Sequence, residues 1–102
     1  MIIEVADIEV HPDCQDEFDR AIVQGVTTVI VHAKGFIGYR VIKGIESPTR
    51  YLLQIEWQTL ENHTVDFRQS EAFGEWRGLV GGFFARPPVV EHFNLVNSSK
   101  RT

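Results

Sequence analysis

The regular alternation of apolar and polar residues near the start of the chain, IIEVADIEV at positions 2–10, restricts the fold more than any other pattern. The apolar side of this segment carries Ala6, Ile8 and Val10, and the opposite side includes Asp7. A period of two is typical of a β-strand with one buried face. We therefore predict a strand over residues 2–10, and the order of the segments that follow decides which fold contains it.

Three further segments alternate in the same way, namely FIGYRVIKG at 36–44, RYLLQIEWQ at 50–58 and VVEHFNLV at 89–96. The first of them places Ile37, Tyr39 and Val41 on one side. A turn around Ser47-Pro48 joins the first two segments and predicts a β-hairpin, because proline and serine favour tight turns. We expect the second strand of this hairpin near the middle of the sheet and residues 89–96 as the last strand.

Residues 12–34 repeat apolar side chains at helical spacing, at Phe18, Ile22, Val26, Val29 and Ala33. This spacing predicts a helix with Pro12 in its first turn and Gly35 after its end. The segment TTVIV within it also suits a strand by propensity, and the helix prediction rests on the period.

We predict a short helix over residues 59–69 and a second helix that begins at Ser70. The Ser70 hydroxyl is expected to cap the free backbone N–H groups of the second helix. Arg86-Pro87-Pro88 stops this second helix. Gly81-Gly82 leaves two readings open: close packing requires these glycines, or the helix ends there.

The resulting order is β-α-β-β-α-β, which predicts a ferredoxin-like α+β fold with a four-stranded antiparallel sheet and helices on one face. We expect residues 1–97 to form a single domain and residues 98–102 to form a disordered polar tail. The uncovered sheet face would carry Ile42, Leu52 and either Val90 or Val96. Exposing such apolar residues is unfavourable, so we expect a homodimer formed through this face.

Composition excludes several classes of protein. A net charge of -4 opposes nucleic acid or an anionic membrane as partner, because phosphate binding needs clustered Lys and Arg. The chain contains no run of about 20 apolar residues, the length that spans a bilayer. Cys14 is the single cysteine, which favours the cytoplasm. His11, His32 and Cys14 lack metal-ligand spacing, so we expect no metal site.

Residues 34–93 also carry a recognisable set of motifs: Gly35-x-x-x-Tyr39, a strand that ends in Trp57, His63-x-x-x-Phe67, Ser70-x-x-Phe73-x-x-Trp76, and a closing strand with His92. In this set the chain resembles the antibiotic biosynthesis monooxygenase (ABM) domain family. The resemblance implies a dimeric α+β barrel. It also implies one of several activities, since the family includes cofactor-free oxygenases, haem-degrading enzymes and isomerases.

The resemblance also allows haem degradation to be tested. Haem-degrading relatives carry a tryptophan and an iron-binding histidine at positions that hold Phe67 and Arg77 here. Arginine stays protonated and cannot ligate iron. We therefore expect no haem. The sequence contains neither a G-x-G-x-x-G motif nor a P-loop, so we expect no other cofactor.

His63 and Arg68 are the candidate catalytic residues. In a helix over 59–69, His63 shares an inward face with Leu60 and Phe67, and an imidazole can act as a base near neutral pH. The alternative is a buried neutral histidine that is bonded to a backbone carbonyl. Arg68 would stabilise an enolate or carboxylate, or would lie solvated on the helix flank.

Five residues are candidates for substrate binding: Trp57, Tyr39, Phe67, Trp76 and Phe84. The first two offer an N–H or O–H donor for a substrate carbonyl. The aromatic rings of the others would line the pocket around an aromatic substrate. All of them also suit the core. We expect a cofactor-independent monooxygenase, or a related isomerase, for a small electron-rich aromatic, quinol or enolisable carbonyl compound. The alternative is a non-catalytic ligand-binding or stress-response protein of the same fold.

Overall fold

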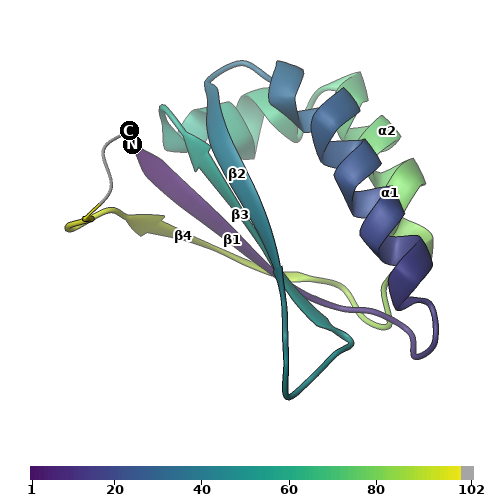
Figure 1. Cartoon of the computed structure of the whole chain (residues 1–102). Coiled ribbons are helices and arrows are strands. Elements are labelled where there is room, and N and C mark those ends of the chain that lie inside the picture. Colours follow the sequence, from purple (N-terminus) through teal and green to yellow (C-terminus); the bar gives the residue numbers. More distant parts are fainter. Residues whose placement is uncertain (100–102) are drawn as a thin grey trace.

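The computed structural model describes residues 1–99, so part of the predicted tail, residues 100–102, lies outside the described residues. Four strands form one antiparallel sheet, and the two main helices lie side by side on the same side of it (Figure 1). The elements are β1 (Ile2–Glu9), α1 (Gln15–Thr28), β2 (Phe36–Lys43), β3 (Arg50–Trp57), α2 (Glu71–Val80) and β4 (Val89–Asn94). This confirms the predicted β-α-β-β-α-β order and the ferredoxin-like fold.

The strand order in the sheet is β2-β3-β1-β4, so β3 lies inside the sheet as predicted. The hairpin of β2 and β3 is also confirmed, but the register shifts between Phe36 and Gly38. Because of this β-bulge, Phe36 pairs with Trp57 and packs against the core, while Ile37 is 43% exposed. The bulge therefore leaves Ile37 without a register partner, and it is Phe36 that joins Tyr39 and Val41 in pairing with the buried residues of β3.

Helix α1 is shorter than predicted. It starts at Gln15, so Pro12 lies in the preceding turn, and it ends at Thr28. The hydroxyls of Thr27 and Thr28 donate to carbonyl oxygens four residues earlier, at 2.7 and 2.6 Å. The β-branched run that follows disfavours further α-helix, and the chain tightens into a 3₁₀ turn over Ile30–His32 instead of forming a strand.

The second helical region also differs in detail. Residues Asn62–Phe67 form a π-helix, and α2 begins after Ser70. The predicted Ser70 cap is wrong, because its hydroxyl donates to the Phe67 carbonyl at 2.6 Å. Of the two readings of Gly81-Gly82, the structure supports the end of α2, since a 3₁₀ turn over Gly81–Phe83 follows it.

The core lies between the helices and one face of the sheet. Its largest enclosed side chains include Phe18 and Ile22 from α1 and Tyr51 and Trp57 from β3. The helices meet closely at Gly25, where an added β-carbon would lie 2.7 Å from the Trp76 ring. Glycine is therefore needed at this crossing, because any side chain would displace the indole.

The opposite face of the sheet carries no helix. Ile42 and Leu52 face this side, as predicted, and pair directly with each other. Val90 does not face it, because Val90 pairs with Ala6, whose side chain is buried under the helices. Val96 follows the end of β4 and is 97% exposed.

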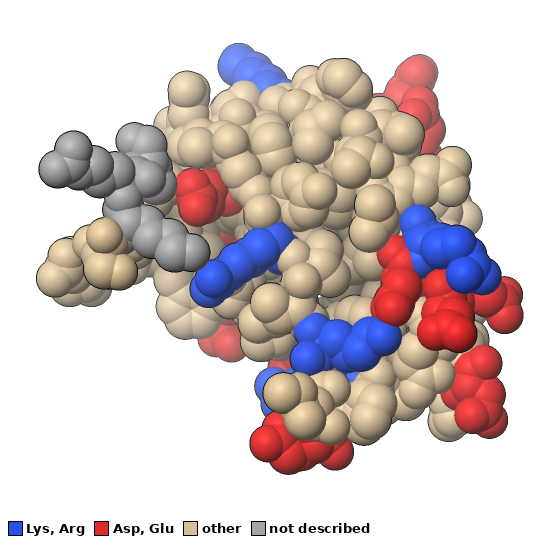
Figure 2. All heavy atoms as spheres, viewed as in Figure 1, with Lys and Arg blue, Asp and Glu red and all other residues tan. Residues whose placement is uncertain are grey.

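Charges of both signs are interspersed on the face shown in Figure 2, where Lys and Arg side chains lie among Asp and Glu side chains. That face therefore presents no extended basic patch of the kind that binds a phosphate backbone. None of the helices between residues 1 and 99 has the length and apolarity needed to cross a membrane.

Candidate active site

A cavity of about 380 Å³ lies between the sheet and the second helical region. This volume is in the range of small-molecule sites. Glu4, Leu53 and Val90 line it from the sheet, and Trp76 and Phe84 line it from the other side. Most of the wall is apolar, so a charged or polar group within it interacts through a medium of low dielectric constant.

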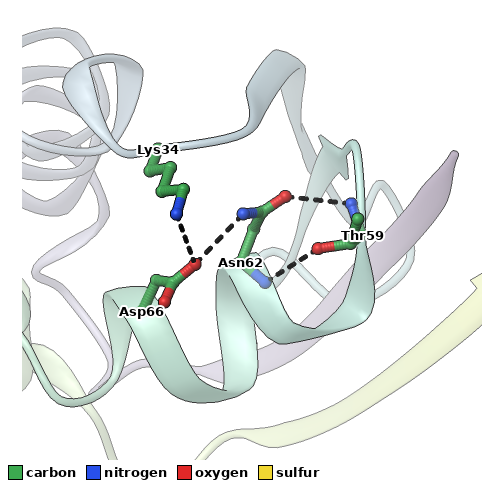
Figure 3. A network of polar contacts seen from close by, with 4 residues as sticks. All are labelled: Lys34, Thr59, Asn62 and Asp66. Atoms are coloured by element: carbon green, nitrogen blue, oxygen red, sulfur yellow. Dashed lines mark hydrogen bonds and ion pairs between the residues drawn. The ribbon is translucent and has the colours of Figure 1, made fainter.

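The π-helix that carries His63 is fixed at its start by a set of polar contacts (Figure 3). The backbone N–H of Thr59 donates to Asn62 Oδ1 at 3.0 Å, and the backbone N–H of Asn62 donates to Thr59 Oγ1 at 3.2 Å. This reciprocal pair resembles a capping box. Asn62 Nδ2 also donates to Asp66 at 3.2 Å, and Lys34 lies 3.9 Å from the same carboxylate oxygen.

The Asn62 side chain also packs on Gly35, whose φ of +81° suits glycine. A β-carbon at Gly35 would lie 2.0 Å from Asn62 Oδ1. The start of β2 and the start of the π-helix are therefore held together, and this contact fixes the position of His63 one residue later.

His63 stands between two titratable side chains from neighbouring strands. Its Nε2 lies 3.3 Å from Glu4 Oε1 on β1, and its Nδ1 lies 2.8 Å from His92 Nε2 on β4. Glu4 and His92 are direct partners in the sheet, which places both on the helix side. Trp57 stacks on the His63 ring and donates its indole N–H to Glu4 Oε1 at 2.9 Å.

Burial controls the protonation of this group. It raises the pKa of Glu4 to about 7, against the hydrogen bond from Trp57 and the charge of Arg68. Burial also lowers the pKa of His63 to about 4, and the charges of Arg68 and His92 act in the same direction. Burial and the charge of Arg68 hold the pKa of His92 below its usual value. Near pH 7 the imidazole of the Glu4–His63 contact is therefore neutral, so the contact is not an ion pair.

Two arginines line the same cavity, Arg68 just after the π-helix and Arg77 on α2. Both side chains are largely exposed, so they lie toward the mouth of the cavity. Arg77 packs over the Phe73 ring at 5.9 Å. The mouth thus offers positive charge, whereas the inner end offers the Glu4 carboxyl group and the His63 imidazole.

The structure brings together five of the residues that the sequence singled out: His63, Arg68, Phe67, Trp76 and Phe84 all line the cavity. Trp57 and Tyr39 are not among the lining residues. Trp57 lies fully buried behind His63. Tyr39 lies on the edge strand β2, is 40% exposed and packs near Phe36.

The sequence analysis did not single out Glu4, and it named His92 only within the motif set, without a role at the site. The signal for Glu4 was present, because it shares the apolar side of β1 with Ala6 and Ile8. A carboxyl group on a buried face requires a partner. Within residues 1–99, no three His, Cys, Asp or Glu side chains are grouped so as to hold a metal ion.

Residues 1–79 match the model of the family named antibiotic biosynthesis monooxygenase. The chain belongs to this family. The family assignment confirms the resemblance seen in the sequence.

An uncharacterized protein of Bacillus subtilis strain 168, YczJ, is 38% identical to this chain over 96 residues. That match covers 94% of this chain and all of YczJ. A crystal structure of a provisionally named antibiotic biosynthesis monooxygenase from Bordetella bronchiseptica is 43% identical, with a TM-score of 0.89 and coverage of 94% of this chain and 97% of that one.

A more distant structure shares the fold alone. It is a monooxygenase from the gene ActVA-Orf6 of Streptomyces coelicolor, solved in complex with the ligand nanaomycin D. The identity is 16%, the TM-score is 0.80, and the match covers 99% of this chain and 92% of that one.

Proposed function

We propose that the protein is a cofactor-independent monooxygenase that acts on a small electron-rich aromatic or enolisable compound. One observation carries this proposal: a buried carboxyl–imidazole pair, Glu4 and His63, lines an otherwise largely aromatic and aliphatic cavity. Family membership supports oxygenase chemistry. The complex of the Streptomyces protein supports it further, because that ligand is held by a chain of the same fold.

The chemistry requires a base and a dry cavity. The Glu4–His63 pair removes a proton from a phenol O–H, and the resulting anion passes an electron to O₂. The two radicals then combine at a ring carbon that carries a hydrogen. Loss of water converts this C–H carbon into C=O, so one oxygen atom of O₂ enters the product, the other leaves as water, and a phenol becomes a quinone.

The remaining residues bind and orient the substrate. Phe67, Trp76 and Phe84 form aromatic walls, and the Arg68 guanidinium stabilises the anion from the mouth of the cavity. Trp57 orients Glu4, since its indole N–H is already used by that carboxyl group. Tyr39 has no part in this proposal, because its side chain lies outside the cavity lining.

Oxygen consumption tests the function. We expect the wild-type protein to consume O₂ with members of a phenol and anthrone panel, and His63→Ala to lower kcat by about 100-fold or more, the usual effect of losing proton transfer. An oxygen electrode measures this directly. His11→Ala is the matched control, because His11 is exposed and precedes α1. Binding of panel compounds without any O₂ consumption would instead identify a non-catalytic ligand-binding protein.

The uncovered sheet face supports a second part of the proposal, a homodimer through that face. Ile42, Leu52, Val89 and Phe93 belong to this face by their register, and three of them are more than 40% exposed. A second copy that covers this surface removes its apolar area from water, which stabilises the dimer by about 25 cal/mol for each Å² buried.

Size-exclusion chromatography with light scattering tests the dimer. The wild-type protein is expected at twice the mass of one chain, and Leu52→Asp at the mass of one chain, because a buried unpaired carboxylate disfavours association. Val23→Asp is the control, since Val23 is exposed on α1, on the other side of the sheet. A wild-type monomer would contradict this part of the proposal.

A further inference from the structure

We propose that Glu4 is the catalytic residue that accepts the substrate proton, and that His63 and His92 connect Glu4 to solvent. This inference rests on the proposed function and assigns the base within it. It starts from the arrangement of the three side chains, which come from β1, the π-helix and β4 and stand in one continuous row.

The free oxygen of Glu4 is the first argument. Both the Trp57 indole and the His63 ring contact Oε1. Within residues 1–99, no hydrogen bond reaches Oε2, and no fully buried side-chain oxygen or nitrogen lacks a partner. Oε2 is therefore not sealed from the cavity that Glu4 lines. It is the carboxyl oxygen available to a substrate O–H.

His63 is placed for a different task. Both of its ring nitrogens are engaged, one by Glu4 and the other by His92, so neither is left to approach a substrate. Its low pKa also makes the imidazole a weak base near pH 7, whereas the carboxyl group of Glu4 titrates near that pH. A base whose pKa matches the working pH transfers protons most effectively.

His92 supplies the outer end of the row. It does not line the cavity, it is only half-buried, and it lies on the edge strand β4. Its Nε2 contacts His63, which leaves Nδ1 for solvent. The inner end of the row thus meets the cavity, and the outer end meets water.

The proton count is balanced in both states. When Glu4 is ionised, His92 Nε2–H donates to His63 Nδ1, and His63 Nε2–H faces Glu4 Oε1. Glu4 then takes the substrate proton on Oε2 and returns it to the peroxide oxygen that leaves as water, which restores the ionised state. The row connects this site to solvent, because a proton that enters from water at His92 Nδ1 shifts each N–H proton one place inward and leaves Glu4 protonated on Oε1, and the reverse shift ionises Glu4 again.

Other charged groups set the working pH of the row. Arg68 acts on all three members and favours the ionised form of Glu4 and the neutral forms of both histidines. Trp57 favours the same ionised form through its N–H. Arg77 also lines the cavity. We therefore expect kcat/KM to rise with pH, with a midpoint near the Glu4 pKa of about 7.

Nuclear magnetic resonance of the unliganded full chain tests the row without any substrate. The ¹³Cδ shift of Glu4 is expected to titrate near pH 7, and the ¹⁵N shifts of His63 and His92 are expected to change tautomer at the same pH. In His92→Ala, the Glu4 titration remains while the His63 tautomer change is altered. A Glu4 carboxyl that titrates in the ordinary range of a glutamate would overturn the inference.

Kinetics with the compound that supports O₂ consumption tests the catalytic role. Glu4→Gln keeps the shape and the acceptor for Trp57, and we expect kcat to fall about 100-fold, with KM nearly unchanged and the limb near pH 7 absent. His92→Ala should lower kcat less than Glu4→Gln does, and added imidazole should restore its activity. A merely structural role for His92 would not give this rescue. Glu75→Gln, on the exposed side of α2, is the control.

The two proposals can fail separately. Full activity in Glu4→Gln would overturn the assignment of the base but not the oxygenase function. Coupled titration without turnover of any compound would overturn the oxygenase function, while the proton connection from the cavity to solvent would stand.

Discussion

Glu4→Gln is expected to unfold less readily than the wild-type protein above pH 7, with a gain of about 2 to 3 kcal/mol in the free energy of unfolding. Burial raises the pKa of Glu4 from an ordinary value of 4.5 to about 7. A carboxyl group with a raised pKa contributes its full stability below pH 4.5 and loses that contribution as the pH rises through 7. Glutamine stays neutral at every pH and retains an oxygen acceptor for Trp57.

The contribution of His63 to stability depends on pH in the opposite direction. Its pKa is lowered from 6.5 to about 4, so its contribution is full above pH 6.5 and is lost as the pH falls through 4. In the wild-type protein the two opposite slopes largely cancel between these limits. Glu4→Gln removes the pH dependence that Glu4 contributes and leaves that of His63. The stability of this variant should therefore fall by about 2 kcal/mol between pH 6.5 and pH 4, relative to wild type.

Urea unfolding monitored by circular dichroism at several pH values between 4 and 8 checks both statements. Glu75→Gln is the matched control, because it removes a carboxylate from the exposed side of α2. Parallel curves for wild type and Glu4→Gln would show that Glu4 is not held protonated by its surroundings.

Trp57→Phe is expected to raise the pKa of Glu4 further above 7 and to cost about 1 to 3 kcal/mol of stability, most of it above that pH. The substitution keeps most of the ring that stacks on His63 but removes the N–H that donates to Glu4 Oε1 at 2.9 Å. An ionised carboxylate that loses a buried donor is destabilised more than a neutral carboxyl group.

Trp76→Phe provides the comparison for this prediction. Trp76 is also buried and lines the cavity, but its contacts are with the core and with Gly25. We expect Trp76→Phe to lower stability by a similar amount at all pH values and to leave the Glu4 titration in place. An unchanged Glu4 titration in Trp57→Phe would contradict the role assigned to the indole N–H.

The elements of this fold were predictable because each follows from a local period. The alternation of residues 2–10 and of the hairpin segments gave strands whose order implied the sheet. The π-helix was not predictable in this way, because its start depends on Asn62, Thr59 and Gly35, which meet only in the folded chain. The end of α1 likewise depends on a run of β-branched residues that suits two structures.

The candidate site was predictable in part. His63 and the aromatic walls follow from helical spacing. The row of proton-carrying groups does not, since it is assembled from three separate elements by the pairing of β1 with β4. Glu4 was visible as a charge on an apolar face, but only the register of the sheet shows that His92 lies opposite it.

The crossing of the helices at Gly25 has a consequence for the range of substrates. Helix α1 contributes no residue to the cavity lining, yet the Trp76 indole, which does, rests against the bare backbone of Gly25. A methyl group at that position would move the indole and reshape the chamber from the outside. The size of ring that is admitted can thus be altered at a site remote from every group that handles protons.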